Sequence, residues 1–148
     1  MSVTVARAMS DVTTKIDELE ARRAARKEAI ETARAEQYAK DLEAIEPIEI
    51  EHGDDRVAAL KTASYVAGLP TIVLVKTPTP ALFARYRQMV RKAGKNIEQV
   101  GAALDLLAES CVAYPAADVY ARMKDAWPSI NDTVGAKAVE LGEAEGKA

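Results

Sequence analysis

The sequence is poor in cysteine and in aromatic residues, and it contains no long apolar run. A single cysteine among 148 residues excludes an internal disulfide, which fits a reducing cytoplasm better than secretion. No stretch approaches the ~20 apolar residues of a membrane span, and the first residues lack the apolar segment of a signal peptide. We therefore expect a soluble, intracellular protein without a membrane-bound part.

A metal-binding constellation is also missing. The only histidine, His52, lies among four acids at positions 49, 51, 54 and 55. One histidine without cysteines does not make a zinc site, and calcium loops need a denser spacing of oxygen ligands. This segment is therefore interpreted as a solvated strand and turn, with a weak cation site as the alternative.

Cys111 lies in the apolar row of a predicted helix, and its only candidate partner for nucleophilic chemistry is His52. A thiol in such a row is usually buried and inert. The glycines are isolated and form neither a phosphate-binding loop nor a dinucleotide fingerprint. We predict that the protein is not an enzyme and that it needs no cofactor and no metal.

The net charge of −3 is unevenly distributed. Residues Asp41–Asp55 include seven acids and no Lys or Arg, whereas Arg56–Ile97 include eight basic residues and no acid. Such polarity can reflect ion pairing within the protein or a surface that attracts a charged partner.

Residues 11–44 contain no glycine or proline and are rich in Ala, Glu, Arg and Lys, which predicts a long charged helix. A heptad counted from Ile16 and Leu19 meets Arg23 and Arg26 at its next apolar positions, so a stable coiled coil is not expected. We interpret the helix as largely solvated, with a partner-binding helix as the alternative. Its end is expected to pack on the rest of the protein through Tyr38, Leu42 and Ile45.

Strand signals follow the long helix. Pro47 is predicted to end it, and Ile48–His52 alternates apolar and polar side chains as a half-buried strand does. After a turn at Gly53–Asp55, residues 56–61 are compatible with a second strand or with a short helix. Residues 71–76 form a short β-branched run typical of a buried strand. The sequence thus predicts an antiparallel meander over about residues 48–76.

The remainder of the chain has helical signals. Thr79 and Pro80 begin a helix that ends near Gly94, and Asn96 begins another whose apolar row includes Ile97, Val100, Leu104, Leu107 and Cys111. Pro115 and Pro128 bound a shorter helix over about 116–126. Ser129 is predicted to cap a last helix with Ile130, Val134, Ala138 and Leu141 facing inward.

The predicted fold is α+β and mainly helical. It consists of a long charged N-terminal helix (residues 1–45), a globular part (46–142) in which the small antiparallel meander packs on a C-terminal helical bundle, and a disordered tail (143–148).

The predicted helix 81–95 carries the candidate partner-binding residues. Aromatic residues dominate binding hot spots, and basic residues on neighbouring turns form a patch that attracts acidic partners or nucleic acid. Pairing with the acidic segment within the protein, or with a protein partner, is favoured over nucleic acid, because the chain is acidic and lacks a recognition-helix motif. The candidate residues are Phe83, Tyr86, Arg85, Arg87 and Arg91, and Lys92 and Lys95 extend the patch.

Five landmarks occur in a characteristic order: a strand with Lys-x-Pro, a helix with F-x-R-Y-R, an apolar helix ending C-V-x-Y-P, a W-P pair, and a final V-x-x-x-A-x-x-L helix. They are carried by Val73–Pro78, Phe83–Arg87, Cys111–Pro115, Trp127-Pro128 and Val134–Leu141. Over about residues 46–141 this order resembles that of the tail assembly chaperones of long-tailed bacteriophages. The resemblance does not extend to the preceding charged helix.

The resemblance implies a non-enzymatic assembly factor in the cytoplasm of the infected host that is absent from the finished virion. It implies binding to the phage tape measure protein, which the chaperone keeps soluble, and recruitment of tail tube protein. A homo-oligomer is left open. The opposing hypotheses are a small nucleic-acid-binding or regulatory protein that uses the basic helix 81–95, and an inert structural adaptor.

Overall fold

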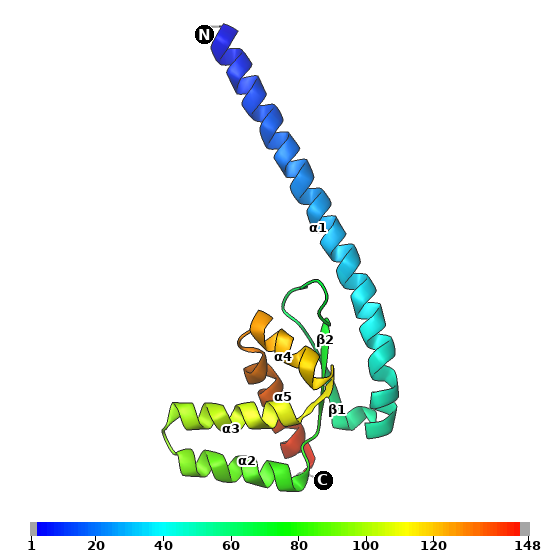
Figure 1. The fold of residues 1–148 in the computed structure, drawn as a ribbon, viewed down its shortest axis with the longest axis vertical. Coiled ribbons are helices and arrows are strands. Elements are labelled where there is room, and N and C mark those ends of the chain that lie inside the picture. Colours follow the sequence, from blue (N-terminus) through cyan, green and yellow to red (C-terminus); the bar gives the residue numbers. More distant parts are fainter. Residues whose placement is uncertain (1–2, 146–148) are drawn as a thin grey trace. The chain divides into compact units, whose positions relative to one another are not determined.

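The computed structural model describes residues 3–145 (Figure 1). The chain divides into two compact units, one ending at Glu36 and the other beginning at Gln37; we call residues 3–36 the arm and residues 37–145 the body. The described residues contain five α-helices, one short 3-10 helix and a three-stranded antiparallel sheet. The mainly helical α+β class is confirmed.

Helix α1 spans Val3–His52 and continues through Pro47. The prediction that Pro47 ends it is wrong, and so is the predicted strand Ile48–His52. Proline inside a helix costs about 3 kcal/mol, but Ile45 and Ile48, one turn apart, both pack against the sheet, and this packing offsets the cost. The helix ends at His52. The next residue, Gly53, has a φ of 95° that suits glycine, and its N–H donates to the Glu49 carbonyl at 2.8 Å.

The sheet has the order β1-β2-β3, with β1 at Val57–Lys61, β2 at Ile72–Lys76 and β3 at Val112–Tyr114. A short 3-10 helix, η1 (Asp54–Arg56), leads into β1. The strand predicted over residues 71–76 is confirmed. Residues 56–61, which the sequence left open between a strand and a short helix, form strand β1 from Val57 onward. Strand β3 was not expected, because the sequence predicts helix up to Pro115, whereas the helix ends at Ser110.

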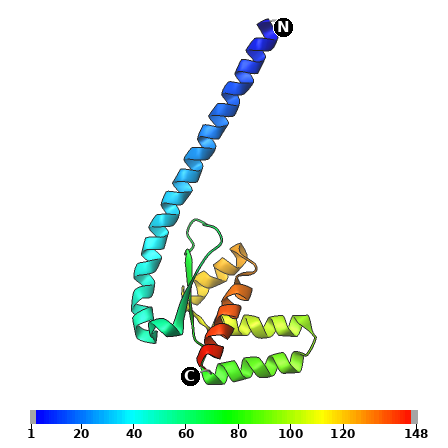
Figure 2. The same ribbon diagram turned by 180° about the vertical axis from the view of Figure 1, so that it is seen from behind.

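The first four residues of strand β2, positions 72–75, are all apolar and buried because both faces of the sheet are covered. Val73 and Val75 belong to the core cluster formed with the C-terminal helices. Ile72 and Leu74 belong to a second cluster with Ile45 of α1. Figure 2 shows the C-terminal part of α1 on one side of the sheet and the remaining helices on the other. A central strand that is buried on both faces has apolar residues at successive positions instead of alternating apolar and polar ones.

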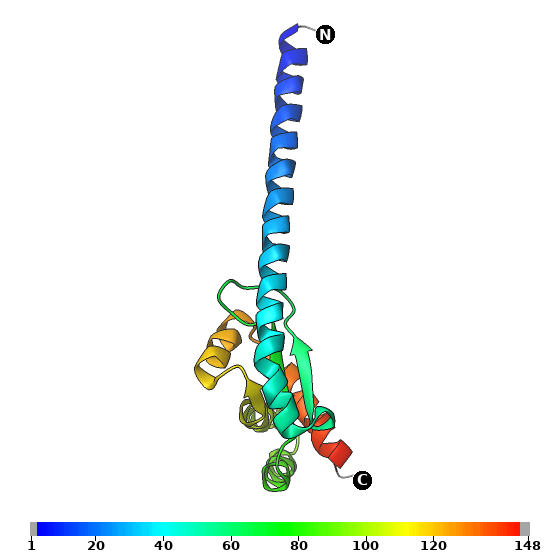
Figure 3. The same ribbon diagram turned by 90° about the vertical axis from the view of Figure 1, so that its right-hand side faces the viewer.

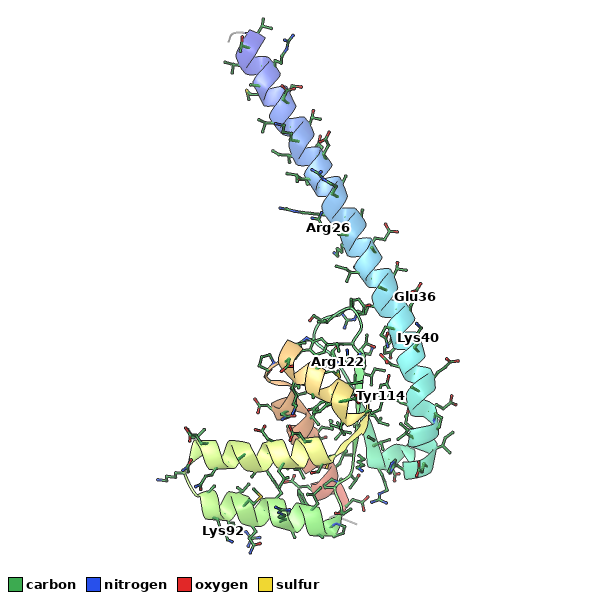
Figure 4. The ribbon with its side chains drawn as sticks, in the orientation of Figure 1. Arg26, Glu36, Lys40, Lys92, Tyr114 and Arg122 are labelled. Carbon is green, nitrogen blue, oxygen red and sulfur yellow. The ribbon has the colours of Figure 1, made fainter. Side chains whose placement is uncertain are left out.

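The boundary between the units lies at residues 36 and 37 rather than at the predicted 45 and 46. The buried carboxylate of Asp41 shows why. Its Oδ2 accepts hydrogen bonds from the Thr71 N–H (2.7 Å) and the Thr71 hydroxyl (2.6 Å), and its Oδ1 accepts from the Tyr114 hydroxyl (2.5 Å) and from Gln37 Nε2 (3.0 Å). Residues 37–45 are therefore part of the body. Tyr114 is labelled in Figure 4.

Helices α2 (Pro80–Ala93) and α3 (Ile97–Ser110) lie side by side, and Figure 3 shows both nearly end-on. Their predicted caps are confirmed. The Thr79 hydroxyl accepts from the Leu82 N–H and the Asn96 side chain accepts from the Gln99 N–H, each at 3.2 Å. Leu107 is buried as predicted, Leu104 is half-buried, and Ile97 is 85% exposed although it belongs to the same apolar row.

Helix α4 (Ala117–Ala126) is followed by α5 (Ile130–Glu145). Val134 and Ala138 of α5 are buried as predicted, and Gly142, the last residue of the predicted globular part, is buried too. A Cβ atom at Gly142 would lie 2.9 Å from Phe83 Cε2, so the glycine lets α5 approach α2 closely. Positions 143–145 of the predicted tail are helical, and 146–148 lie outside the described residues.

Candidate partner-binding site

A hollow of about 420 Å³ lies where α2, the end of α5 and the segment before β1 meet. We call it the Phe83 hollow. It is larger than the hollow of about 240 Å³ beside Trp127 and Ile130. Its lining combines apolar and basic side chains: Arg56, Pro78, Pro80, Phe83, Ala84, Arg87, Arg91, Gly142 and Glu145.

The fold positions Phe83 and Arg87 by ordinary helix geometry. Residues one turn apart lie on the same face, and the guanidinium carbon of Arg87 lies 4.6 Å from the centroid of the Phe83 ring. This distance is typical of a cation–π contact. Phe83 also stacks on Tyr86, with centroids 6.1 Å apart and an interplanar angle of 17°. Gly142 lies directly against the ring, so the ring forms part of the wall shared by α2 and α5.

Three of the five predicted binding residues come together here: Phe83, Arg87 and Arg91 all line the hollow. Tyr86 packs instead against the main core cluster. Arg85 is exposed and lies outside the hollow. Lys92, which extends the basic patch, is also exposed and projects from the outer side of α2 in Figure 4.

The sequence did not indicate the other two charged residues that line the hollow, Arg56 and Glu145. Arg56 precedes β1, and its Nε donates to Glu145 Oε1 at 2.9 Å. The two residues are 89 positions apart, and Glu145 falls in a segment that the sequence predicts to be a tail. No spacing pattern in the sequence reveals that Arg56 and Glu145 form a pair. They meet only because the sheet and the full length of α5 bring them together.

The Phe83 hollow carries an excess of positive charge. Three guanidinium groups, from Arg56, Arg87 and Arg91, line it together with one carboxylate, that of Glu145. Glu145 is paired with Arg56, which leaves Arg87 and Arg91 without an acidic partner within residues 3–145. An arginine side chain offers several hydrogen-bond donors in a planar fork that suits carboxylates and phosphates. The hollow can therefore hold an apolar side chain next to an acidic one.

The acidic segment 41–55 does not neutralise this patch. Among the described residues, the ion pairs join Arg56 to Glu145, Lys124 to Glu109, and Lys137 to Glu140. The most buried acid of the segment, Asp41, is bonded to Thr71 and Tyr114 instead. The alternative of internal pairing between the two charged segments is thus not what the fold uses.

The groups with shifted pKa values owe the shifts mainly to burial or to hydrogen bonds within the fold. Cys111 is fully buried, as predicted, and burial raises the pKa of its thiol to about 11 despite the opposing charge of Lys76. Burial is also the main cause that raises the pKa of Tyr114 and of Tyr120. The pKa of Glu109 is lowered, chiefly by its hydrogen bond from Lys124.

Within residues 3–145, no three His, Cys, Asp or Glu side chains gather in a way that could hold a metal ion. None of the described helices combines the length and the apolar character needed to cross a membrane. Comparison of the chain with protein-family models, with curated proteins and with solved structures finds no match.

Proposed function

We propose that the protein is a tail assembly chaperone of a long-tailed bacteriophage. In this role it is a non-enzymatic factor of the infected host's cytoplasm that binds the tape measure protein, keeps it soluble and helps recruit tail tube protein. It leaves before the virion is complete. The proposal is motivated by the order of the proline and aromatic landmarks between residues 46 and 141.

The observation that carries the proposal is the composition of the Phe83 hollow. An exposed surface that combines an aromatic ring, two prolines and two unpaired arginines is typical of sites that bind a protein segment. An amphipathic helix can place an apolar side chain against Phe83 while a neighbouring Asp or Glu bonds to Arg87 or Arg91. A long amphipathic helix with an exposed apolar side needs a protein bound to that side to stay soluble.

Coexpression tests the proposal. The tape measure protein encoded beside this chain should be recovered in the soluble fraction with the parent protein and should precipitate without it. Arg87→Glu reverses a charge in the hollow and should reduce the soluble yield severalfold. Arg85→Glu makes the same charge change two residues away, outside the hollow, and serves as the matched control. Equal losses in both variants would contradict binding at the hollow, and insolubility with the parent protein would contradict the function.

A nucleic-acid-binding role is the second candidate, because α2 carries Arg85, Arg87, Arg91 and Lys92 and no acid. Affinity for short duplex DNA would then fall steeply as salt increases, since phosphate contacts release counterions. Binding to the tape measure protein through an apolar side chain should depend on salt much less. We expect only weak, salt-sensitive binding to DNA.

A further inference from the structure

An apolar row runs along the arm, from Val5 to Leu19. It consists of Val5, Met9, Val12, Ile16 and Leu19, whose spacing alternates between four and three residues. Each of these side chains is 45–55% exposed. Five apolar residues at consecutive seam positions are unusual on a helix that the composition otherwise makes highly charged, because exposure of a contiguous apolar row is unfavourable in water.

The spacing of the row is that of a coiled coil. An average period of 3.5 residues keeps a seam facing a second helix when the two helices wrap around each other. In heptad notation Met9 and Ile16 occupy position a, and Val5, Val12 and Leu19 occupy position d. A straight helix that packs on a globular surface would instead show a period of 3.6 and a wider apolar face.

We propose that the row is the seam of a short parallel coiled coil between two copies of this chain, over residues 5–19. Charge complementarity identifies the second copy as the occupant. Lys15 lies at position g and Glu20 at the following position e, so a parallel pair in register places each Lys15 next to the Glu20 of the other copy. Within residues 3–145 neither side chain has an ion pair.

The same charges argue against an antiparallel pair. Antiparallel helices bring g next to g and e next to e. In an antiparallel pair that packs Met9 on Val12 of the other copy, Lys15 lies next to Ala8 of that copy. Glu20 then lies beyond the end of the other copy's seam and has no charged neighbour there. Among parallel coiled coils, a β-branched residue such as Ile16 at position a followed by Leu19 at position d favours two strands rather than three or four.

Repulsion between like charges should end the seam after Leu19. Arg23 and Arg26 occupy the next a and d positions, where each would face its own counterpart in a parallel pair, and Arg22 would face Lys27. These like charges should separate the two helices after Leu19, before the body begins at Gln37. A seam of five layers is short, so the pairing should be weak and dependent on protein concentration.

Sedimentation equilibrium of the full chain, from low micromolar to submillimolar concentration, tests the proposal. The average mass should increase toward that of a dimer as concentration rises. Ile16→Lys should abolish this increase. Thr14→Lys adds the same charge on the opposite side of the helix and should leave the increase unchanged. A mass that stays monomeric for the parent chain at every concentration would overturn the proposal, as would equal effects of the two variants.

A charge exchange tests the orientation without disturbing the seam. Glu20→Lys should weaken the dimer about tenfold or more, because it places Lys15 next to a second lysine. The double variant Lys15→Glu/Glu20→Lys should restore it. Failure of the double variant to restore the dimer would overturn the parallel arrangement. A monomeric parent chain whose Ile16→Lys variant no longer retains the tape measure protein would assign the row to that protein instead.

Discussion

The arm and the body differ in what holds their helices together, although one helix runs through both. In the arm every large apolar side chain with a described environment is exposed, and the helix depends on the propensity of Ala, Glu, Arg and Lys. In the body the same helix buries Asp41 and Ile45 against the sheet. The difference shows that α1 is stabilised by the helix propensity of its residues up to Glu36. From Gln37 onward it is stabilised by packing against the sheet.

The largest effect should come from removing the buried carboxylate where α1 enters the body. Asp41→Ala leaves the Thr71 N–H and two hydroxyl groups without their acceptor, and we expect it to lower the free energy of unfolding by about 3–5 kcal/mol. Asp17→Ala changes an exposed acid of the arm and should cost less than about 0.5 kcal/mol. Urea denaturation of both variants measures the contrast. If Asp17→Ala lowered the free energy of unfolding as much as Asp41→Ala does, the arm would have to contribute to the stability of the body.

The close approach of α5 to α2 gives the next largest effect. Gly142→Ala places a methyl group about 2.9 Å from the Phe83 ring. Overpacking of this kind typically costs about 1–3 kcal/mol, only partly compensated by the better helix propensity of Ala. Gly101→Ala, on α3 with open space around it, should instead be neutral or stabilising. Thermal unfolding compares the two, and a stabilised Gly142→Ala variant would contradict the packing of Phe83 described above.

A pH dependence confined to the body should follow from Cys111. Burial raises the pKa of its thiol from 9.0 to about 11, so above pH 9 the unfolded chain loses a proton that the folded chain keeps. Stability contributed by the neutral thiol is therefore complete below pH 9 and is lost as the pH rises toward 11, by about 1–2 kcal/mol. In Cys111→Ala this part of the pH dependence should be absent. Parallel curves for the two proteins would contradict the assignment.

The smallest effect should come from removing the arm. A chain that begins at Gln37 keeps Asp41, Ile45 and both core clusters, and its denaturation midpoint should lie close to that of the full chain when both are dilute. A chain that begins at residue 46 lacks the Asp41 carboxylate and should be strongly destabilised. If the chain starting at Gln37 failed to fold, the arm would have to be counted as part of the body.

Local signals explain which elements the sequence predicts correctly. Strand β2 has its β-branched run. Helix α2 has its N-cap at Thr79 and its terminal glycine at Gly94, and α3 has its N-cap at Asn96. The failures depend on distant contacts. Pro47 is tolerated because Ile45 and Ile48 pack on the sheet, and the three-residue strand β3 exists because Val112 and Tyr114 pair with β2.

The two candidate surfaces were predictable to different extents. Phe83, Arg87 and Arg91 share one helix, so their proximity follows from spacing, whereas Arg56 and Glu145 meet only through the tertiary fold. The apolar row of the arm was visible in the sequence, but a heptad counted forward from Ile16 meets the arginines at once. Counting backward to Val5 reveals five consecutive seam positions.

Binding of purified tape measure protein to the immobilised chain, at low and high salt, tests the proposed function most directly. We predict retention by the parent protein and by Arg85→Ala at both salt concentrations, with a severalfold loss for Arg87→Ala. Circular dichroism confirms that each protein is folded. Short duplex DNA, tested in parallel, should bind weakly and only at low salt. Tight binding to DNA that Arg87→Ala abolishes, with no tape measure protein retained by the parent, would contradict the chaperone assignment and favour the nucleic-acid alternative.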